Sequence, residues 1–131
     1  MRKILKVAGP CLAYLNLLFA TDSMAFDLHS KVVTKASAIP NLDIELVIQP
    51  DENMKINQDG PWKLEISNLE KANAAKTKLV KEDMNFSLPG FKLSLNGAQA
   101  GGKCDYKLTA FVCTKDKSQC FRDVHTGSLK W

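Results

Sequence analysis

The sequence predicts an all-β protein with an antiparallel β-sandwich fold. About seven short apolar or alternating segments follow one another at roughly ten-residue spacing, with turn residues between them. The chain does not show the strand–helix alternation that builds α/β folds. Its 131 residues leave room for one domain and little else.

The N-terminal segment 1–25 has the composition of a secretory signal peptide. A basic start, MRKILK, precedes an apolar stretch from Val7 to Ala20, and the polar TDSMA follows. Ser23 and Ala25 satisfy the small-x-small rule, so we expect cleavage after Ala25, with Ala20 as the alternative. The apolar stretch is shorter than the roughly 20 residues that span a bilayer, so we favour cleavage over an uncleaved anchor. Residues 26–131 would then form a single exported β-sandwich domain.

Removal of the signal segment changes the charge of the chain. The segment holds three basic residues and one acidic residue, so the net charge of +4 falls to +2. No dense basic stripe with interleaved aromatic residues remains, and we expect no nucleic-acid partner. We also expect no membrane span in the mature chain. Cys11 lies inside the apolar stretch and should leave with the signal.

The expected strands follow from apolar alternation and turn residues. They are a leading arm or edge strand over 26–40, strands over 42–48 and 62–66, a short strand before Pro89, and strands over 91–95, 104–113, 119–124 and 127–131. In the segment WKLEI, for example, Trp62, Leu64 and Ile66 alternate with charged residues. Residues 68–78 contain no apolar stripe, so we expect a loop there.

Cys113 and Cys120 stand at the two ends of the polar turn TKDKSQ. If the flanking strands form a hairpin, opposed Cα atoms lie about 4.5–5.5 Å apart, within reach of a disulfide. Cys104 lies nine positions before Cys113 on the same expected strand, or roughly 30 Å away, and the same register places it opposite Leu129. We therefore expect a Cys113–Cys120 disulfide in an exported protein. Cys104 is the odd thiol, either buried and inert or the site of an intermolecular bridge.

The expected disulfide is either a passive staple or a redox-active pair. The short ring that it closes would contribute about 2–3 kcal/mol by loop closure, a modest gain. Lys115 and Lys117 lie in the turn between the sulfurs and would favour a thiolate on either cysteine. On these residues alone, the staple is slightly favoured over the redox-active pair.

Other chemistry has less support in the sequence. Three cysteines and a histidine supply zinc-type ligands (Cys104, Cys113, Cys120 and His125), but their spacing C-x8-C-x6-C-x4-H matches no common structural zinc site. We expect His29 and His125 to be ordinary surface histidines. No serine–histidine–acid arrangement and no phosphate-binding glycine loop stands out, so we predict neither a metal nor a cofactor.

Four segments follow one another in an order that points to a known family. They are a Pro-flanked strand, the segment INQDGPWKLEI, the segment NFSLPGFKL, and a Gly-rich connection leading into a strand with FVCTKDKSQC. This order resembles the N-terminal periplasmic domain of the thiol:disulfide interchange protein DsbD and its small stand-alone relatives in Gram-negative bacteria. The resemblance covers about residues 40–131, and it implies an immunoglobulin-like sandwich in the periplasm.

The resemblance also implies roles for particular residues. In the family, a cysteine pair on neighbouring strands receives electrons from a membrane partner and passes them to oxidised periplasmic proteins. By position, Cys113 and Cys120 would be that catalytic pair, and Phe86 is the nearest candidate for an aromatic cap loop over the sulfurs. The cysteine spacing is one residue longer than we expect of the family, and the polar turn replaces small and aromatic residues.

Two functions follow from these observations. The first is a periplasmic thiol:disulfide exchange module whose partners are other periplasmic or membrane exchange proteins. The alternative is a non-catalytic binding module in which the Cys113–Cys120 disulfide only pins a hairpin. In that case a sheet edge, or the loops at 68–78 and 96–102, would carry the binding surface.

Overall fold

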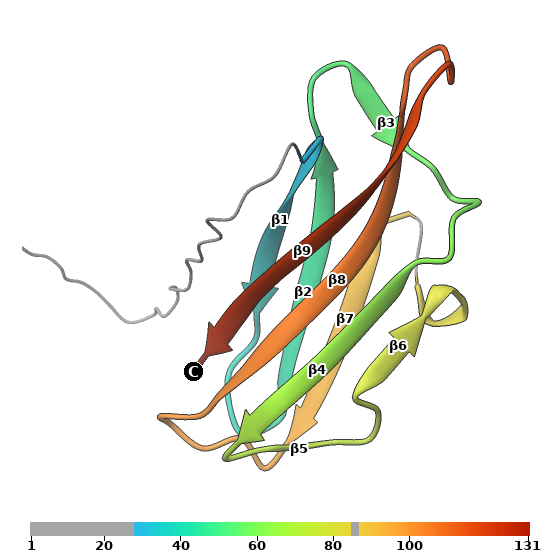
Figure 1. Cartoon of the computed structure of the whole chain (residues 1–131). Coiled ribbons are helices and arrows are strands. Elements are labelled where there is room, and N and C mark those ends of the chain that lie inside the picture. The colour runs from blue at the N-terminus through green and yellow to red at the C-terminus, as the bar shows by residue number, and fades with distance from the viewer. Residues whose placement is uncertain (1–27, 85–86) are drawn as a thin grey trace, which may run out of the picture.

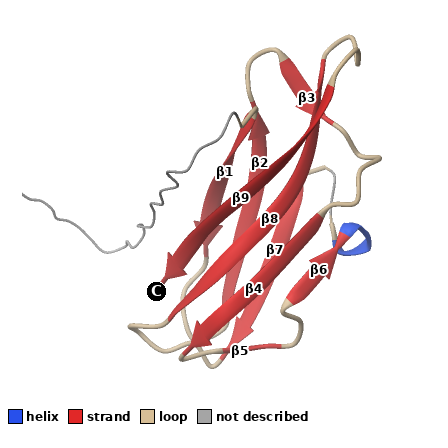
Figure 2. Ribbon diagram, viewed as in Figure 1, coloured by secondary structure: helices blue, strands red, loops and turns tan. Residues whose placement is uncertain are grey.

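The computed structural model describes residues 28–84 and 87–131. Apart from one short 3₁₀ helix, the regular structure of these residues is all β (Figure 2). The elements are β1 (Ser30–Ala36), β2 (Leu42–Pro50), β3 (Met54–Ile56), β4 (Lys63–Glu70), β5 (Asn73–Ala74), β6 (Lys78–Val80), the 3₁₀ helix η2 (Lys81–Asp83), β7 (Gly90–Asn96), β8 (Lys103–Thr114) and β9 (Cys120–Lys130).

The strands form two antiparallel sheets. The first is four-stranded, in the order β1-β2-β7-β5. In the second, five-stranded sheet β8 is central: β9 pairs with one of its edges, while β3 and β4 pair with successive parts of the other edge and β6 lies outside β4. Figure 1 shows the sheets as two layers, with β9, β8 and β4 in front of β2 and β7. The predicted antiparallel β-sandwich is confirmed.

The core lies between the sheets and follows the two-residue period of the strands. In β2, every second residue from Leu42 to Ile48 is buried and the residues between them are half-buried. β8 contributes Leu108, Ala110 and Val112, which are completely shielded from solvent. Because burying one Val, Leu or Ile side chain is worth about 1.5–3 kcal/mol, these alternating apolar residues are what holds the layers together.

The structure has more strand than the sequence predicts between the main segments. At 68–78, where we expect a loop, β4 continues to Glu70 and β5 pairs with the edge of β7. The three-residue strand β3 also lies where no strand is expected. Such short strands join a sheet through backbone hydrogen bonds alone, which need no apolar alternation. The pattern of side chains therefore gives little sign of them.

The prediction of two separate C-terminal strands is wrong. β9 runs from Cys120 to Lys130 without a break and pairs with β8 along the whole of that length. Gly127, which suggests a turn, instead makes room inside the sheet for the ring of Tyr106. A Cβ atom on Gly127 would lie 2.9 Å from that ring. The β8–β9 hairpin is consequently the longest pairing among the described residues.

Asp123 links the two sheets where β1 and β9 meet. Its buried carboxylate accepts hydrogen bonds from the Ser30 hydroxyl and from the backbone N–H of His29, the latter at 2.9 Å. His125 is only 7 % exposed, so the prediction of a surface histidine is wrong at this position. Its Nε2 atom lies 3.0 Å from the Ser30 hydroxyl oxygen. His29 is half-buried and stacks on Phe121, with ring centroids 3.7 Å apart.

Candidate functional site: a disulfide at the tip of the β8–β9 hairpin

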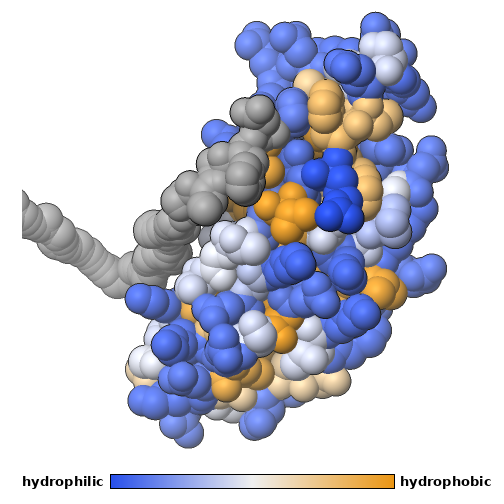
Figure 3. All heavy atoms as spheres, in the orientation of Figure 1, coloured by the Kyte–Doolittle hydropathy of each residue, from blue (hydrophilic) through white to orange (hydrophobic). Residues whose placement is uncertain are grey.

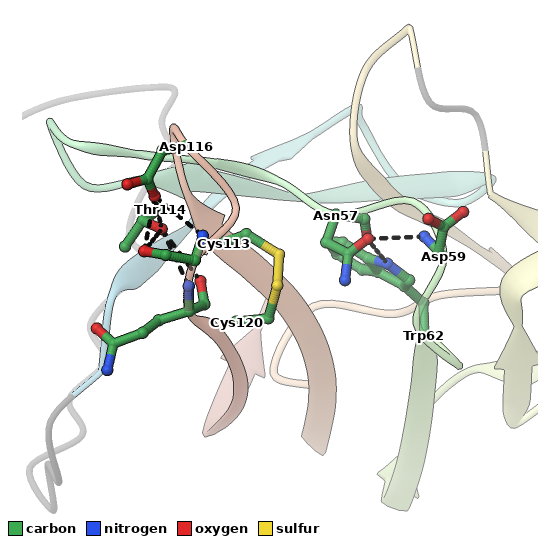
Figure 4. The surroundings of a disulfide bond; sticks show 9 residues. Asn57, Asp59, Trp62, Cys113, Thr114, Asp116 and Cys120 are labelled. Atoms are coloured by element: carbon green, nitrogen blue, oxygen red, sulfur yellow. Dashed lines mark hydrogen bonds between the residues drawn. A yellow bond between two sulfur atoms is a disulfide. The ribbon is translucent and has the colours of Figure 1, made fainter.

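The Cys113–Cys120 disulfide joins the end of β8 to the start of β9 (Figure 4). The sulfur atoms are 2.05 Å apart and the two Cα atoms 3.9 Å apart. The strand register places Cys113 opposite Cys120 and Cys104 opposite Leu129. Both the predicted disulfide and the predicted register are confirmed.

The turn between the cysteines has a hydrogen-bond network of its own. The Asp116 carboxylate accepts bonds from the Thr114 hydroxyl (2.7 Å), the Ser118 backbone N–H (2.9 Å) and the Ser118 hydroxyl (2.8 Å). These bonds hold the pKa of Asp116 at about 2, with the Ser118 backbone bond as the largest cause. Thr114 N also donates to the Gln119 carbonyl at 2.8 Å. The turn therefore holds the two cysteines close together independently of the bond between them.

The two cysteines differ in their exposure to solvent. Cys113 is 2 % exposed, whereas Cys120 belongs to the exposed residues of the hairpin tip. Cys113 is not part of the core cluster that includes its neighbour Val112, because alternate residues of β8 face opposite sides of the sheet. The disulfide lies on the outer face of the five-stranded sheet. Within the described part of the chain, Cys120 is therefore the more accessible cysteine of the bond.

Two cationic residues on neighbouring strand positions, neither predicted from the sequence to belong to the site, share the face of the disulfide. Lys55 is the register partner of Cys113 in β3, and cross-strand partners point to the same face of a sheet. Arg122 lies two residues after Cys120 on β9 and therefore also shares its face. A nearby cation favours a thiolate, so Lys55 and Arg122 would act in that direction on Cys113 and Cys120. The predicted pair Lys115 and Lys117 lies in the turn, exposed to solvent.

The sequence could place one of these two residues at the site but not the other. Arg122 could be found from the hairpin register, which pairs it with Phe111. Lys55 could not, because the three-residue strand β3 carries too little pattern to be recognised. The site is therefore assembled from three strands, of which the sequence predicts two.

The predicted cap residue Phe86 lies outside the described residues. Within them, Phe111 is an aromatic side chain on the face of the disulfide, two residues before Cys113. A loop folds against it: a Cβ atom on Gly60 would lie 2.3 Å from the Phe111 ring, so only glycine fits there. The same loop is fixed by the indole of Trp62, whose Nε1 donates to the Asn57 carbonyl at 2.8 Å. Figure 4 shows this loop on the opposite side of the disulfide from Asp116.

The outer face around the site is mixed in polarity. In Figure 3, hydrophilic residues cover most of the face that β8 and β9 present, and a group of hydrophobic residues interrupts them in its upper part. Phe111 and Val124, which are half-buried, belong to the strand positions on this side of the sheet. The disulfide thus has a partly apolar setting.

Ser30, Asp123 and His125 come together although the sequence shows no such motif. The Ser30 hydroxyl donates its one proton to Asp123, so it is the His125 Nε2–H that donates to the Ser30 oxygen. Activation of a serine nucleophile requires the reverse, a histidine that accepts the serine proton. This cluster therefore joins the strands and is not arranged for nucleophilic catalysis.

The free thiol Cys104 is separate from the site. It is 1 % exposed and belongs to the core cluster. Burial, and to a smaller extent the negative charge of Asp105, raises the pKa of its thiol to about 12. Of the two roles open to it, buried and inert thiol or intermolecular bridge, this position agrees with the first. Among residues 28–84 and 87–131, no group of three or more histidine, cysteine and acidic side chains is placed to hold a metal ion.

Comparison of the chain with protein-family models, with curated proteins and with solved structures finds no match. The resemblance to the DsbD domain therefore rests on the residues of this sequence and stays a prediction. In the part of the chain that the structure describes, no helix is long and apolar enough to cross a membrane.

Proposed function

We propose that this chain is a periplasmic thiol:disulfide exchange module that acts through Cys113 and Cys120. The observation that carries the proposal is the unequal exposure of two cysteines within one disulfide. With one cysteine exposed and the other buried, a mixed disulfide would form at Cys120, and Cys113 would be in place to resolve it. The periplasmic location rests on the expected signal peptide, and the partners would be other periplasmic or membrane exchange proteins.

The reaction starts from the reduced pair. The Cys120 thiolate attacks one sulfur of a partner's disulfide, forming a mixed disulfide and releasing the partner's other sulfur as a thiolate, which takes up a proton. Cys113 then loses its proton and attacks the Cys120 sulfur, which releases the partner's second thiol. The pair loses two electrons and two protons in total, and the partner's disulfide gains them. A reduced protein of higher reducing power would restore the pair by the reverse steps.

The surroundings of the pair suit this sequence of steps. Lys55 and Arg122 share the face of the disulfide and would favour the thiolate form. The hydrogen bonds within the turn would keep Cys113 and Cys120 close together after the disulfide is reduced.

Variants in which one cysteine of the pair is replaced, made in the chain with Cys11→Ser, test the assigned roles. Cys113→Ser leaves the exposed Cys120, and Cys120→Ser leaves the shielded Cys113. With hydroxyethyl disulfide as the probe, we expect the Cys113→Ser variant to form its mixed disulfide at least about tenfold faster, because reactivity follows exposure and thiolate character. Mass spectrometry of quenched samples gives both rates. Equal rates, or a faster Cys120→Ser variant, would refute the assignment.

A specific observation also favours the second candidate function, a non-catalytic binding module. The hydrogen-bonded turn makes the hairpin tip a fixed structure, to which the disulfide would only add rigidity. In that case Cys113→Ser combined with Cys120→Ser would lower the free energy of unfolding by about 2–3 kcal/mol and leave partner binding unchanged. A double variant that folds normally but no longer exchanges would exclude this alternative.

A further inference from the structure

The free edge of β9 begins at the exposed cysteine of the disulfide. We infer that an exchange partner docks there as an added β-strand, with its reactive cysteine opposite Cys120. This inference rests on the proposed exchange function and names how the partner is recognised: by the backbone of an extended, cysteine-containing segment.

β9 is an edge strand of the five-stranded sheet. Among the described residues it pairs with β8 alone, from Cys120 to Lys130. The opposite edge of β9 therefore presents a row of backbone N–H and C=O groups with which a partner strand would pair. Extended peptides commonly bind proteins by pairing with such an edge.

Two hydrogen bonds show which residues of β9 present these groups. Thr114 N donates to Gln119 O, so the next pair, Cys113 and Cys120, is a pair without mutual bonds. Asn57 N donates to Phe111 O, so the Phe111 carbonyl points toward β3 and away from β9. By the alternation of an antiparallel ladder, the backbone N–H and C=O of Cys120 and of Arg122 point to the free edge.

β1 passes close to β9 but uses a different set of its residues. The contacts of Ser30 and of His29, which precedes β1, run to Phe121, Asp123 and His125, whose side chains face the other sheet. The backbone groups of these three residues point toward β8. Contact with β1 therefore leaves the outward groups of Cys120 and Arg122 without a bond among residues 28–84 and 87–131.

The geometry of an added strand suits a mixed disulfide. A residue placed opposite Cys120 would form a hydrogen-bonded antiparallel pair with it, at a Cα separation of about 5.5 Å. Most disulfides span Cα separations of about 4.4–6.8 Å. The partner's cysteine side chain would also point to the outer face, where the Cys120 sulfur lies. Strand addition thus brings the reacting sulfurs together and fixes their direction.

The test uses the whole chain with Cys11→Ser, reduced, and two disulfide probes. The first is a short peptide rich in threonine and valine whose central cysteine is held as a mixed disulfide with 2-mercaptoethanol. The second is hydroxyethyl disulfide, which has no backbone to pair. In each case the protein pair is oxidised and the probe takes up two electrons and two protons.

Proline substitutions on β9 separate strand pairing from chemistry. Arg122→Pro removes an outward N–H beside Cys120, and Thr126→Pro removes one farther along the same edge. Neither removes a bond to β8, because both N–H groups point to the free edge. Proline is tolerated in a strand at such positions. Arg122→Ala is the matched control, since it removes the same side chain and keeps the N–H.

We expect Arg122→Pro to react with the peptide about fivefold more slowly than Arg122→Ala, the size of one net hydrogen bond. Both variants lack the Arg122 cation and should react with hydroxyethyl disulfide at the same rate as each other, while Thr126→Pro should react with the peptide as fast as the unsubstituted chain. Equal rates of Arg122→Ala and Arg122→Pro with the peptide would overturn the inference while exchange itself stands. Failure of the unsubstituted chain to react with hydroxyethyl disulfide would overturn the proposed function and this inference together.

A variant of the peptide keeps the test independent of protein folding. Prolines on both sides of its cysteine remove the N–H groups that would pair with β9. The unsubstituted protein should reduce this peptide more slowly than the threonine- and valine-rich one. Equal rates for the two peptides would also contradict docking by strand addition.

Discussion

At the scale of single residues, Asp116 organises the turn that separates the two cysteines. Its carboxylate accepts three hydrogen bonds within the turn. Because these bonds favour the charged form, the pKa of Asp116 is lowered to about 2 from a value of 3.8. A group whose pKa is lower in the folded state stabilises the fold above its unfolded pKa and loses that effect as the pH falls.

The stabilising effect of Asp116 should therefore depend on pH. We expect Asp116→Asn to lower the free energy of unfolding near neutral pH, and the difference from the unsubstituted chain to shrink as the pH falls from about 4 to about 2. Urea unfolding at several pH values measures this difference. The pKa of Asp83 and of Asp105 is also lowered, so only the comparison of the two proteins isolates Asp116. A difference that stays constant over this range would contradict the assigned role.

Cys104 should be chemically silent in the folded protein. With a pKa raised to about 12, its thiolate fraction at pH 8 is about one part in ten thousand, and the residue is 1 % exposed. We expect iodoacetamide to label Cys104 only after the chain is unfolded. Peptide mapping by mass spectrometry distinguishes it from the other cysteines. Rapid labelling of the folded protein at Cys104 would show that the thiol is accessible.

At the scale of the elements, β9 contributes both to the link between the sheets and to the candidate site. Alternate residues of β9, including Asp123 and His125, form backbone hydrogen bonds with β8. The side chains of Asp123 and His125 also contact Ser30 of β1. The residues between them, which include Cys120 and Arg122, face the outer side of the sheet. The strand therefore joins the link between the sheets to the candidate site.

Removal of the Asp123 carboxylate should weaken this link. Asp123→Ala would leave the Ser30 hydroxyl and the His29 backbone N–H without their buried acceptor. We expect a loss of about 2–3 kcal/mol in the free energy of unfolding, the usual consequence of unsatisfied buried groups. Asp59→Ala, at an exposed loop position, is the control and should change stability by less than about 0.5 kcal/mol. Similar small effects for both variants would contradict the role of Asp123.

The elements also show what the sequence can and cannot predict. Strong alternation predicts the central strands, and the cysteine spacing predicts the hairpin register that the structure confirms. The predicted break within β9 is wrong because polar residues at its inner positions find buried partners from β1, which lies far away in the sequence. Neither β3 nor β5 has enough residues to show a period.

At the scale of the whole molecule, the sandwich presents its disulfide on an outer face and not between the sheets. The core cluster excludes both cysteines of the bond. A staple between the layers would tie the fold together, whereas this bond closes one hairpin tip. This position is compatible with the proposed exchange function, which rests on the unequal exposure of the two cysteines.

Some residues of the candidate site are close together in the sequence, whereas others are brought there by the pairing of distant strands. Cys113, Cys120 and Arg122 lie on one hairpin, so their relation can be deduced from the sequence. Lys55 and the loop at Gly60 reach the site through the arrangement of the five-stranded sheet. No local pattern contains that arrangement, because it depends on which strands pair with the second edge of β8.

The reduction potential of the Cys113–Cys120 pair tests the central claim most directly. It can be measured by equilibrating the protein with dithiothreitol buffers and counting reduced cysteines by mass spectrometry. An exchange pair should have a potential above about −300 mV, within reach of cellular thiol–disulfide couples. A potential well below that value would mark a structural bond and contradict the proposed function.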